Sequence, residues 1–299
     1  MDKRLKGTLF GAVAAITYGT NPLFSLPLYE YGMSTGSILF YRYVFAVVLL
    51  GIILKVRGES LAIKKKEVLP LFVLGILFAM SSWLLYKSFL YMDAGIACTI
   101  LFVYPVMVAL IMTLFFKEKA SWLTYGCICL TMVGIAMLYD GGQAAVSRTG
   151  LILVVLSSLC YAIYIVGVNR SVLKDMPAGK MTFWSILFGL LVFVVGTGFF
   201  TGLQAIPPTL SGWGSVLGSA IFPTVISIMF INISIKNIGA TFAAILGALE
   251  PVTALVIGVS VFDEQLTARV VIGAALILIA VSLVAGGKPL LQKLGVRSK

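Results

Sequence analysis

Residues 237–267 read NIGATFAAILGALEPVTALVIGVSVFDEQLT, and residues 91–121 read YMDAGIACTILFVYPVMVALIMTLFFKEKAS. A shift of 146 positions aligns the two stretches without a gap and places Pro105 on Pro251. In both stretches a glutamate follows the proline 13 positions later. Apolar segments resemble one another by chance, so the matching proline and glutamate positions are the better sign of duplication. The two stretches predict an internal repeat, and this repeat decides the fold.

The composition is that of a membrane protein. Of the 299 residues, 60% are hydrophobic and 11% are charged, and the mean hydropathy is +1.08. Soluble globular proteins carry about 25% charged residues. A bilayer-spanning helix needs roughly 20 mostly apolar residues, and apolar blocks of that length recur along the chain without the alternation of barrel strands. We expect ten spans, at residues 7–28, 34–54, 68–90, 94–116, 121–139, 149–169, 179–200, 213–235, 239–261 and 268–286.

The basic residues gather on one side of such a chain. The net charge is +11, from 22 Lys and Arg residues against 11 Asp and Glu residues. With the N-terminus inside, 18 of the 22 basic residues fall in inside segments, whereas Arg148 and Arg269 fall outside. Cytoplasmic loops carry such an excess, so we expect both termini to be cytoplasmic and the membrane to be the cell inner (plasma) membrane. The charge then reports orientation, and we expect no nucleic-acid partner.

A weaker echo extends the repeat toward the N-terminus. With a shift of 143 positions, Tyr18 in ITYGTNPLFS meets Tyr161 in LCYAIYIVGV. The chain thus divides into two five-helix halves, 1–143 and 144–299. Because five is odd, the second half inserts upside down relative to the first. The predicted fold is an all-α polytopic membrane protein with ten transmembrane helices in two inverted five-helix repeats, which is typical of secondary transporters with sites near the midplane.

These features resemble the drug/metabolite transporter superfamily, and within it the EamA-like transporters of ten helices in two five-helix repeats. The matching stretches are ILFVYPVMVALIMTLFFKEKAS and LGALEPVTALVIGVSVFDEQLT, with the Glu250–Pro251 pair and FYRYVFA at 40–46. The resemblance covers nearly the whole chain. It implies an inner-membrane carrier for amino acids, other metabolites or drugs, frequently working outward, and it implies no particular substrate.

Glu250 is the candidate that the sequence singles out. It lies about eleven residues into the ninth predicted span, roughly 16 Å deep and close to mid-bilayer. A charge there costs about 2.5–3.5 kcal/mol on insertion scales, which an apolar helix can offset. Two interpretations stay open: Glu250 handles substrate or protons, or it is protonated and hydrogen-bonded to a neighbouring helix. We expect Pro251 to free the Gly247 carbonyl beside the acid. The first-repeat counterpart of Glu250 is Tyr104.

Two basic residues fall within predicted spans. Arg42 lies about eight residues into the second span, roughly 12 Å from its outer end. It contacts a substrate carboxylate or Glu250, braces one helix against another, or snorkels outward. Lys87 lies near the outer end of the third span, with Glu30 and Asp93 on the same side. Substrate contact, a rim ion pair and snorkelling are its alternatives.

Polar and aromatic residues share helix faces by their spacing. Interfacial belts and helix packing are the alternative roles of the aromatic ones. The candidate substrate-binding residues are Glu250, Tyr18, Asn21, Arg42, Trp83, Lys87, Tyr104, Tyr161 and Tyr164. The candidate helix-kink or gating residues are Pro22, Pro105 and Pro251.

The chain has no histidine, and its four cysteines have neither disulfide nor metal-site spacing. We therefore expect small buried cysteines, no metal and no cofactor. Glu118 and Glu264 precede helices expected to begin near Ser121 and Thr267. We expect the hydroxyls to cap these helices and the acids to complement the helix dipoles, rather than to act as gates.

The sequence predicts a secondary transporter and not an enzyme. It would move small metabolites across the inner membrane by alternating access, as an exporter, with a small-molecule substrate, the lipid bilayer and protons as its partners. No Walker-type phosphate loop is present, so ATP is not the expected energy source. An importer and a channel or scramblase are the alternatives, while a membrane enzyme is hard to assemble without histidine. A monomer suffices, and the oligomeric state stays open.

Overall fold

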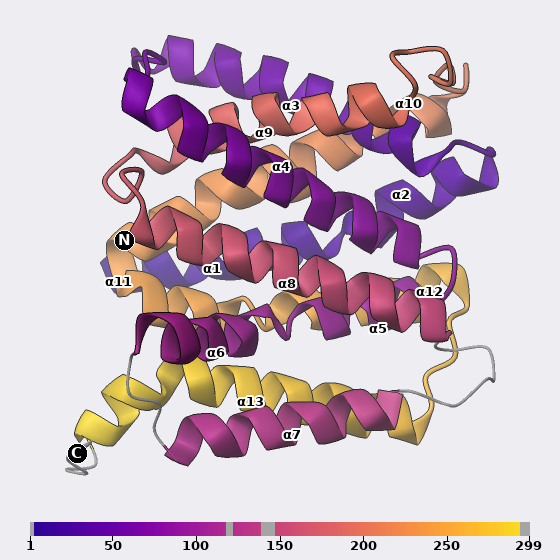
Figure 1. Ribbon diagram of the computed structural model, residues 1–299. Coiled ribbons are helices and arrows are strands. Elements are labelled where there is room, and N and C mark those ends of the chain that lie inside the picture. The colour runs from indigo at the N-terminus through magenta and orange to yellow at the C-terminus, as the bar shows by residue number, and fades with distance from the viewer. Residues whose placement is uncertain (1–2, 118–121, 139–146, 294–299) are drawn as a thin grey trace.

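The computed structural model describes residues 3–117, 122–138 and 147–293. Helices make up almost all of this part of the chain, which contains no strand (Figure 1). In chain order the helices are α1 (Lys3–Gly19), α2 (Asn21–Glu30), α3 (Thr35–Val56), α4 (Lys65–Ser88), α5 (Ala94–Leu101), α6 (Tyr104–Phe116), α7 (Trp122–Leu138), α8 (Arg148–Arg170), α9 (Ala178–Gly196), α10 (Leu210–Ala220), the π-helix η1 (Ile221–Ile226), α11 (Ser227–Leu246), α12 (Leu249–Phe262) and α13 (Ala268–Lys293). The predicted all-α fold is confirmed.

The described helices account for the predicted spans. Seven helical stretches are long and apolar enough to cross a bilayer. Three shorter apolar helices, Tyr125–Leu138, Leu249–Phe262 and Ala268–Leu283, stand where the fifth, ninth and tenth spans are expected. The chain is therefore a multi-pass membrane protein.

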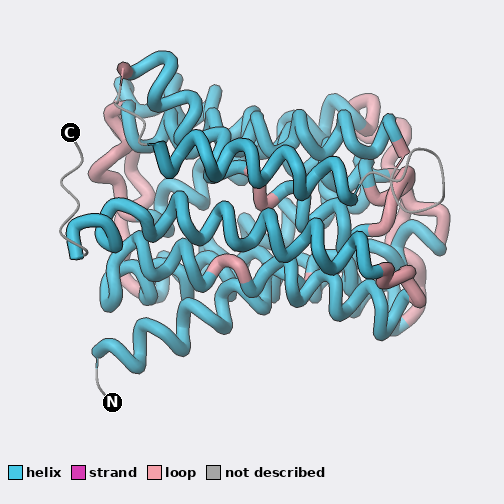
Figure 2. The backbone as a smooth tube through the Cα atoms, turned by 90° about the horizontal axis from the view of Figure 1, so that it is seen from below, coloured by secondary structure: helices cyan, strands magenta, loops and turns pink. Residues whose placement is uncertain are grey.

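The spans run side by side, and their connections alternate between the two ends of the bundle (Figures 1 and 2). We call the right-hand end in Figure 1 the capped end. Its connections are residues 31–34, 89–93, 197–209 and 263–267. We call the left-hand end the basic end. It holds the start of α1, the end of α13 and the connections 57–64 and 171–177. Because α1 runs toward the capped end and α8 runs away from it, the two repeats are inverted.

Helix packing follows the repeat. α3 packs on α9, α5 on α12 and α7 on α13, and each pair joins equivalent spans of the two repeats. α4 packs on α8, and the equivalent pair, α11 and α1, also packs together. Helix ends repeat too, since Lys117 closes α6 and Asp263 closes α12 with left-handed φ values of 55° and 53°. The predicted division of the chain after residue 143 lies outside the described residues.

Each proline named as a kink candidate stands at a helix break. α1 ends at Gly19 and α2 begins at Asn21, so the helix is interrupted directly before the Asn21–Pro22 pair, where the kink is predicted. Pro105 and Pro251 lie in the first turns of α6 and α12, rather than in the centre of continuous helices. A first turn does not need the missing N–H of proline, whereas a proline deeper in a helix clashes with the preceding turn. Figure 2 shows short non-helical segments midway along the bundle.

The sequence predicts a loop at 236–238 between the eighth and ninth spans. The structure instead has a helix there, because α11 runs through these residues and joins the two spans. A methyl group on Gly11 would lie 2.5 Å from Ser234 Oγ and 2.7 Å from Leu246 Cδ1. A straight helix would separate residues 234 and 246 by about 18 Å. The chain therefore reverses direction within α11, as the two predicted spans require.

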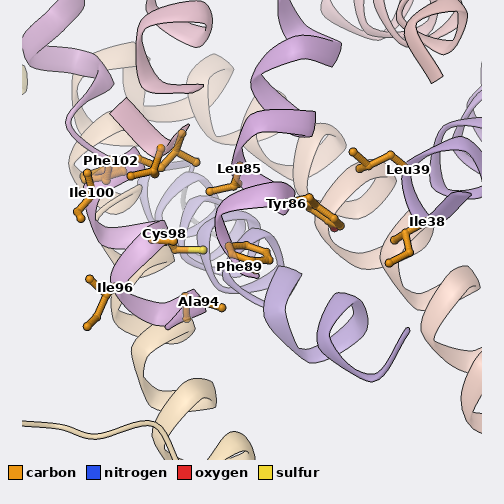
Figure 3. Packing of buried hydrophobic residues seen from close by; sticks show 14 of the residues in the cluster. Ile38, Leu39, Leu85, Tyr86, Phe89, Ala94, Ile96, Cys98, Ile100 and Phe102 are labelled. Carbon is orange, nitrogen blue, oxygen red and sulfur yellow. The ribbon is translucent and has the colours of Figure 1, made fainter. Parts of the chain in front are cut away.

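The buried core is concentrated toward the capped end. All residues of α5 are buried, whereas in α6, the other half of the same span, only Val106 is buried. Figure 3 shows Leu85 and Tyr86 of α4, with Phe89 directly after that helix, between the side chains of α5 and Leu39 of α3. Close packing of this kind holds the capped halves of several spans together.

Candidate functional site

Glu250 lies in the first turn of α12, beside the break that separates α11 from α12. A methyl group on Gly19 would lie 2.5 Å from the Glu250 carbonyl oxygen and 2.7 Å from Thr253 Cβ, so the end of α1 touches the start of α12. Two broken spans, one from each repeat, therefore meet at Glu250. The prediction that the Gly247 carbonyl is free is wrong, because the Glu250 N–H donates to it over 2.9 Å. A tightened first turn supplies the bond that Pro251 cannot make.

The Glu250 carboxyl has no hydrogen-bond partner among the described residues. The hydroxyls of Tyr18, Tyr104 and Tyr161 likewise have none. All three phenols interact electrostatically with Glu250. One acid and three phenols without described hydrogen-bond partners thus lie within electrostatic range of one another near the helix break.

Aromatic rings form one wall of this region. The rings of Tyr104 and Tyr161 meet edge to face with centroids 4.7 Å apart. The rings of Tyr161 and Tyr164 stack with centroids 6.0 Å apart and an angle of 9°, so the predicted shared face on α8 is confirmed. Phe78 of α4 lies 5.2 Å from Tyr164 between ring centroids. Edge-to-face and stacked rings are favourable arrangements and hold the wall rigid.

Arg42 lies in a separate hydrogen-bond cluster whose other members are neutral. Its Nε donates to Thr224 Oγ1 over 3.0 Å, and its Nη1 donates to Asn21 Oδ1 over 2.8 Å. Nη1 also donates to the hydroxyl of Tyr86, which in turn donates to Asn21 Oδ1 over 3.1 Å. Thr224 belongs to the second repeat and the other three to the first, so the cluster bridges the repeats. We call these four residues the Arg42 cluster.

The Arg42 cluster is almost closed. Arg42 is 6% exposed, Thr224 3%, Asn21 2% and Tyr86 1%. The described residues include no ion pair between Arg42 and Glu250, so that alternative for Arg42 is not what the structure adopts. Tyr18 interacts electrostatically with both Glu250 and Arg42. The acid and the cation thus both lie within electrostatic range of one phenol.

Trp83 and Lys87 lie apart from the other candidates. The ring of Trp83 stacks on Phe193 of α9, with centroids 5.7 Å apart. A methyl group on Gly196 would overlap the Trp83 ring, so this side chain packs between α4 and α9. Lys87 is exposed in the last turn of α4, at the capped end.

Glu264 has a role different from the one expected. Its Oε1 accepts the N–H of Ala94 over 2.7 Å, and its Oε2 accepts the N–H of Gly95 over 3.1 Å. The acid therefore caps α5 of the other repeat, while Thr267 caps α13 by accepting the N–H of Val270 over 3.3 Å. Burial raises the pKa of the Glu264 carboxyl, although the two backbone donors oppose this rise. Glu118 and Ser121 lie outside the described residues.

Two members of the Arg42 cluster, Tyr86 and Thr224, were absent from the sequence-based candidates. Tyr86 lies one position before Lys87 on a different face of α4, and Thr224 lies in η1 directly after Pro223. Neither has a spacing that points to Arg42. Only the packing of α3 against α10 and η1 brings Thr224 within reach of the guanidinium.

The cysteines do not extend the site. Cys98 and Cys127 are buried as expected, but Cys129 is exposed, because residues two apart point to different faces of α7. Among the described residues, no group of three His, Cys, Asp or Glu side chains could hold a metal ion.

Comparison with known proteins identifies a family. The model of the EamA-like transporter family matches residues 5–140 and again residues 148–286. The chain is similar to an uncharacterized transporter, sll1319, of Synechocystis, with 30% identity over 206 residues. That match covers 67% of this chain and 61% of the relative, less than two thirds of its length.

Other relatives match over more of their length. The uncharacterized transporter YyaM of Bacillus subtilis is 24% identical over 89% of this chain and 90% of its own. The biotin transporter of Escherichia coli is 22% identical over 76% of this chain and 75% of its own. A solved crystal structure superposes with a TM-score of 0.67 at 18% identity, covering 97% of this chain and 99% of the other, which supports the fold.

Proposed function

We propose that the chain, which belongs to the EamA-like transporter family, carries small molecules across a membrane as a secondary transporter that works by alternating access. The proposed units are the repeats 1–143 and 144–299, which rock against each other around the helix breaks. The proposed membrane is the cell inner membrane, with both termini in the cytoplasm, because the basic end would then face inside. We assign outward transport, with import as the alternative.

The carboxyl of Glu250, which has no described hydrogen-bond partner, carries this proposal. It lies in the first turn of α12, where broken spans of both repeats meet. Ionisable groups at such depth are costly and therefore usually functional. Three phenols lie within electrostatic range of it, so an amphiphilic substrate would find both polar and aromatic partners there. We assign Glu250 to proton coupling and Tyr18, Tyr104 and Tyr161 to substrate contact.

The packing supports a state that is closed toward the capped end. There α5 packs on α12, and Glu264 bridges them. At the basic end α6, the other half of the α5 span, packs on α8, α13 and α7 instead. With the basic end inside, the site would face the cytoplasm in this state. Transport would then require α5 and α12 to separate at the capped end.

The proposal is tested with the purified chain in proteoliposomes, loaded with mixed labelled metabolites and given a pH gradient. Glu250→Gln should lower gradient-driven transport by roughly 30-fold, the scale for losing a buried charged interaction, and should remove its pH dependence. Glu30→Gln, at an exposed acid of the capped end, is the matched control and should leave transport unchanged. Full and equally pH-dependent transport by Glu250→Gln would remove this residue from the mechanism.

Counterflow separates a carrier from a channel or scramblase. A carrier exchanges labelled for unlabelled substrate and saturates, because each cycle moves a bound molecule. Linear flux without exchange would favour a pore and end the alternating-access proposal. Reversing the imposed gradient separates an exporter from an importer.

A further inference from the structure

Arg42 is a buried cation whose recorded partners are all neutral. Its Nε and Nη1 are held by Thr224, Asn21 and Tyr86, and the guanidinium also lies 5.3 Å from the centre of the Tyr86 ring. The other terminal nitrogen, Nη2, donates to no described residue. Nη2 is not among the fully enclosed unpartnered atoms either. One edge of the guanidinium is thus fixed, and Nη2 on the other edge has no described hydrogen-bond partner.

An isolated buried charge is costly unless an opposite charge meets it. Within the described residues no carboxylate forms an ion pair with Arg42, Glu250 included. The three neutral bonds orient the guanidinium but leave its positive charge uncompensated. A counter-charge must therefore come from outside the described chain when the site is loaded.

We propose that Arg42 anchors a single carboxylate of the transported molecule, so that this protein takes small organic monocarboxylates with an apolar or aromatic body. The inference rests on the proposed function and names its substrate class. The carboxylate accepts the N–H groups of Nη2, and the body lies along Tyr18 toward the wall of Tyr104 and Tyr161.

The geometry favours one carboxylate over other charged groups. The guanidinium is planar and matches carboxylate oxygens, whereas an amine would be repelled. Lys87 is exposed at the capped end, so it offers no second charge beside Arg42 for a dianion or a phosphate ester. Phenols and stacked rings suit an apolar body with few hydrogen-bonding groups.

The first test compares matched probes on the purified full chain in detergent, with binding followed by calorimetry and by the thermal unfolding midpoint. The probes are 3-phenylpropionate, indole-3-acetate and hexanoate, each against its own primary amide. At least one carboxylate should bind roughly tenfold or more tightly than its amide, because a charge-assisted bond is lost with the amide. Equal binding of acid and amide in every pair, or no binding of any carboxylate, would overturn the proposal.

Variants assign the preference to Arg42. Arg42→Gln should bind acid and amide equally, and Arg42→Lys should keep a reduced preference for the acid, because it retains charge without the planar group. Arg148→Gln, at an exposed arginine in α8, is the matched control and should behave as wild type. Thr224→Val removes the Nε bond and the bond from Thr224 Oγ1 to the Ser219 carbonyl, but it keeps the charge of Arg42. It should keep the preference, so it separates loss of positioning from loss of the charge. An unchanged acid preference in folded Arg42→Gln would also overturn the proposal.

Proteoliposome transport distinguishes failure here from failure of the proposed function. Glu250-dependent counterflow of neutral or cationic solutes, without any carboxylate preference, would leave the carrier intact and remove the role of Arg42. Carboxylate binding without any counterflow would keep the role of Arg42 and contradict the proposed carrier function.

Discussion

The span of α5 and α6 and the span of α11 and α12 are equivalent in the repeat but differ at their breaks. Both breaks precede a proline in a first helical turn, and both spans end in a left-handed residue. At the first break stands Tyr104, whose ring packs on Tyr161 and Phe102. At the second stands Glu250, whose carboxyl has no described partner. A symmetric scaffold thus carries an asymmetric site.

The neighbours of the two breaks explain why the acid stands at the second. The Tyr104 break faces α8, where the Ser158 hydroxyl donates to the Leu101 carbonyl over 3.1 Å and satisfies the helix end. The Glu250 break faces the end of α1, where Gly19 lets two backbones touch. The acid interacts electrostatically with Tyr18, whose repeat counterpart Tyr161 packs on Tyr104 at the first break. The two breaks therefore share a phenol and differ in the acid.

Moving the acid tests this comparison with the largest expected effect. In the Glu250→Gln background, Tyr104→Glu should leave gradient-driven transport depressed by roughly 30-fold, because the new acid lies away from Arg42. The measurement is proteoliposome uptake across a pH range, with Tyr104→Phe as the control that keeps shape and removes the hydroxyl. Recovery of more than half of wild-type transport would mean that either break can carry the acid.

Contact between α1 and α12 is tested by the next largest change. Gly19→Ala places a methyl group 2.5 Å from the Glu250 carbonyl oxygen and should cost about 2 kcal/mol of unfolding free energy, as overpacking does. Gly126→Ala in α7 has open space around the new methyl and is the matched control. It should be neutral or slightly stabilising, because alanine favours helices by up to about 1 kcal/mol over glycine. Denaturant titration in detergent measures both, and equal effects would contradict the close approach at Gly19.

The fold could be predicted because its causes are local or periodic. Apolar blocks of bilayer length gave the spans, and the repeated proline and glutamate positions gave the inverted halves. The breaks were harder to predict, because a proline in a sequence does not distinguish a kink from a helix start. At Pro105 and Pro251 the chain starts a new helix. The Glu250 N–H then donates to the Gly247 carbonyl, whereas the Ser158 hydroxyl donates to the Leu101 carbonyl at the other break.

The site could be predicted only in part, because long-range packing sets the partners. The shared face of Tyr161 and Tyr164 follows from helical spacing and was found. The cap that Glu264 places on α5 was missed, since its partners lie 170 and 169 positions away in the chain. Spacing within one helix carries no information on such contacts.

The cap that Glu264 places on α5 joins the two compared spans. The titration of the Glu264 carboxyl predicts a smaller effect, which is on thermal stability. Burial raises the pKa of Glu264 in the folded chain, so its contribution to stability is largest at acidic pH and is lost as pH rises through the folded pKa. The unfolding midpoint of wild type relative to Glu264→Gln should therefore fall by a few °C from acid to neutral pH. Thermal scans at several pH values measure this, with Glu30→Gln as the control. A difference that grows with pH would contradict the sign.

The smallest effect is expected beyond both breaks, at Lys87. This residue was a candidate for substrate contact, but it is exposed in the last turn of α4 at the capped end. Lys87→Gln should change the unfolding free energy by less than about 0.5 kcal/mol, as surface substitutions do, and should leave transport near wild type. A strong loss of uptake, with stability intact, would extend the site to the capped end and weaken the contrast between the two breaks.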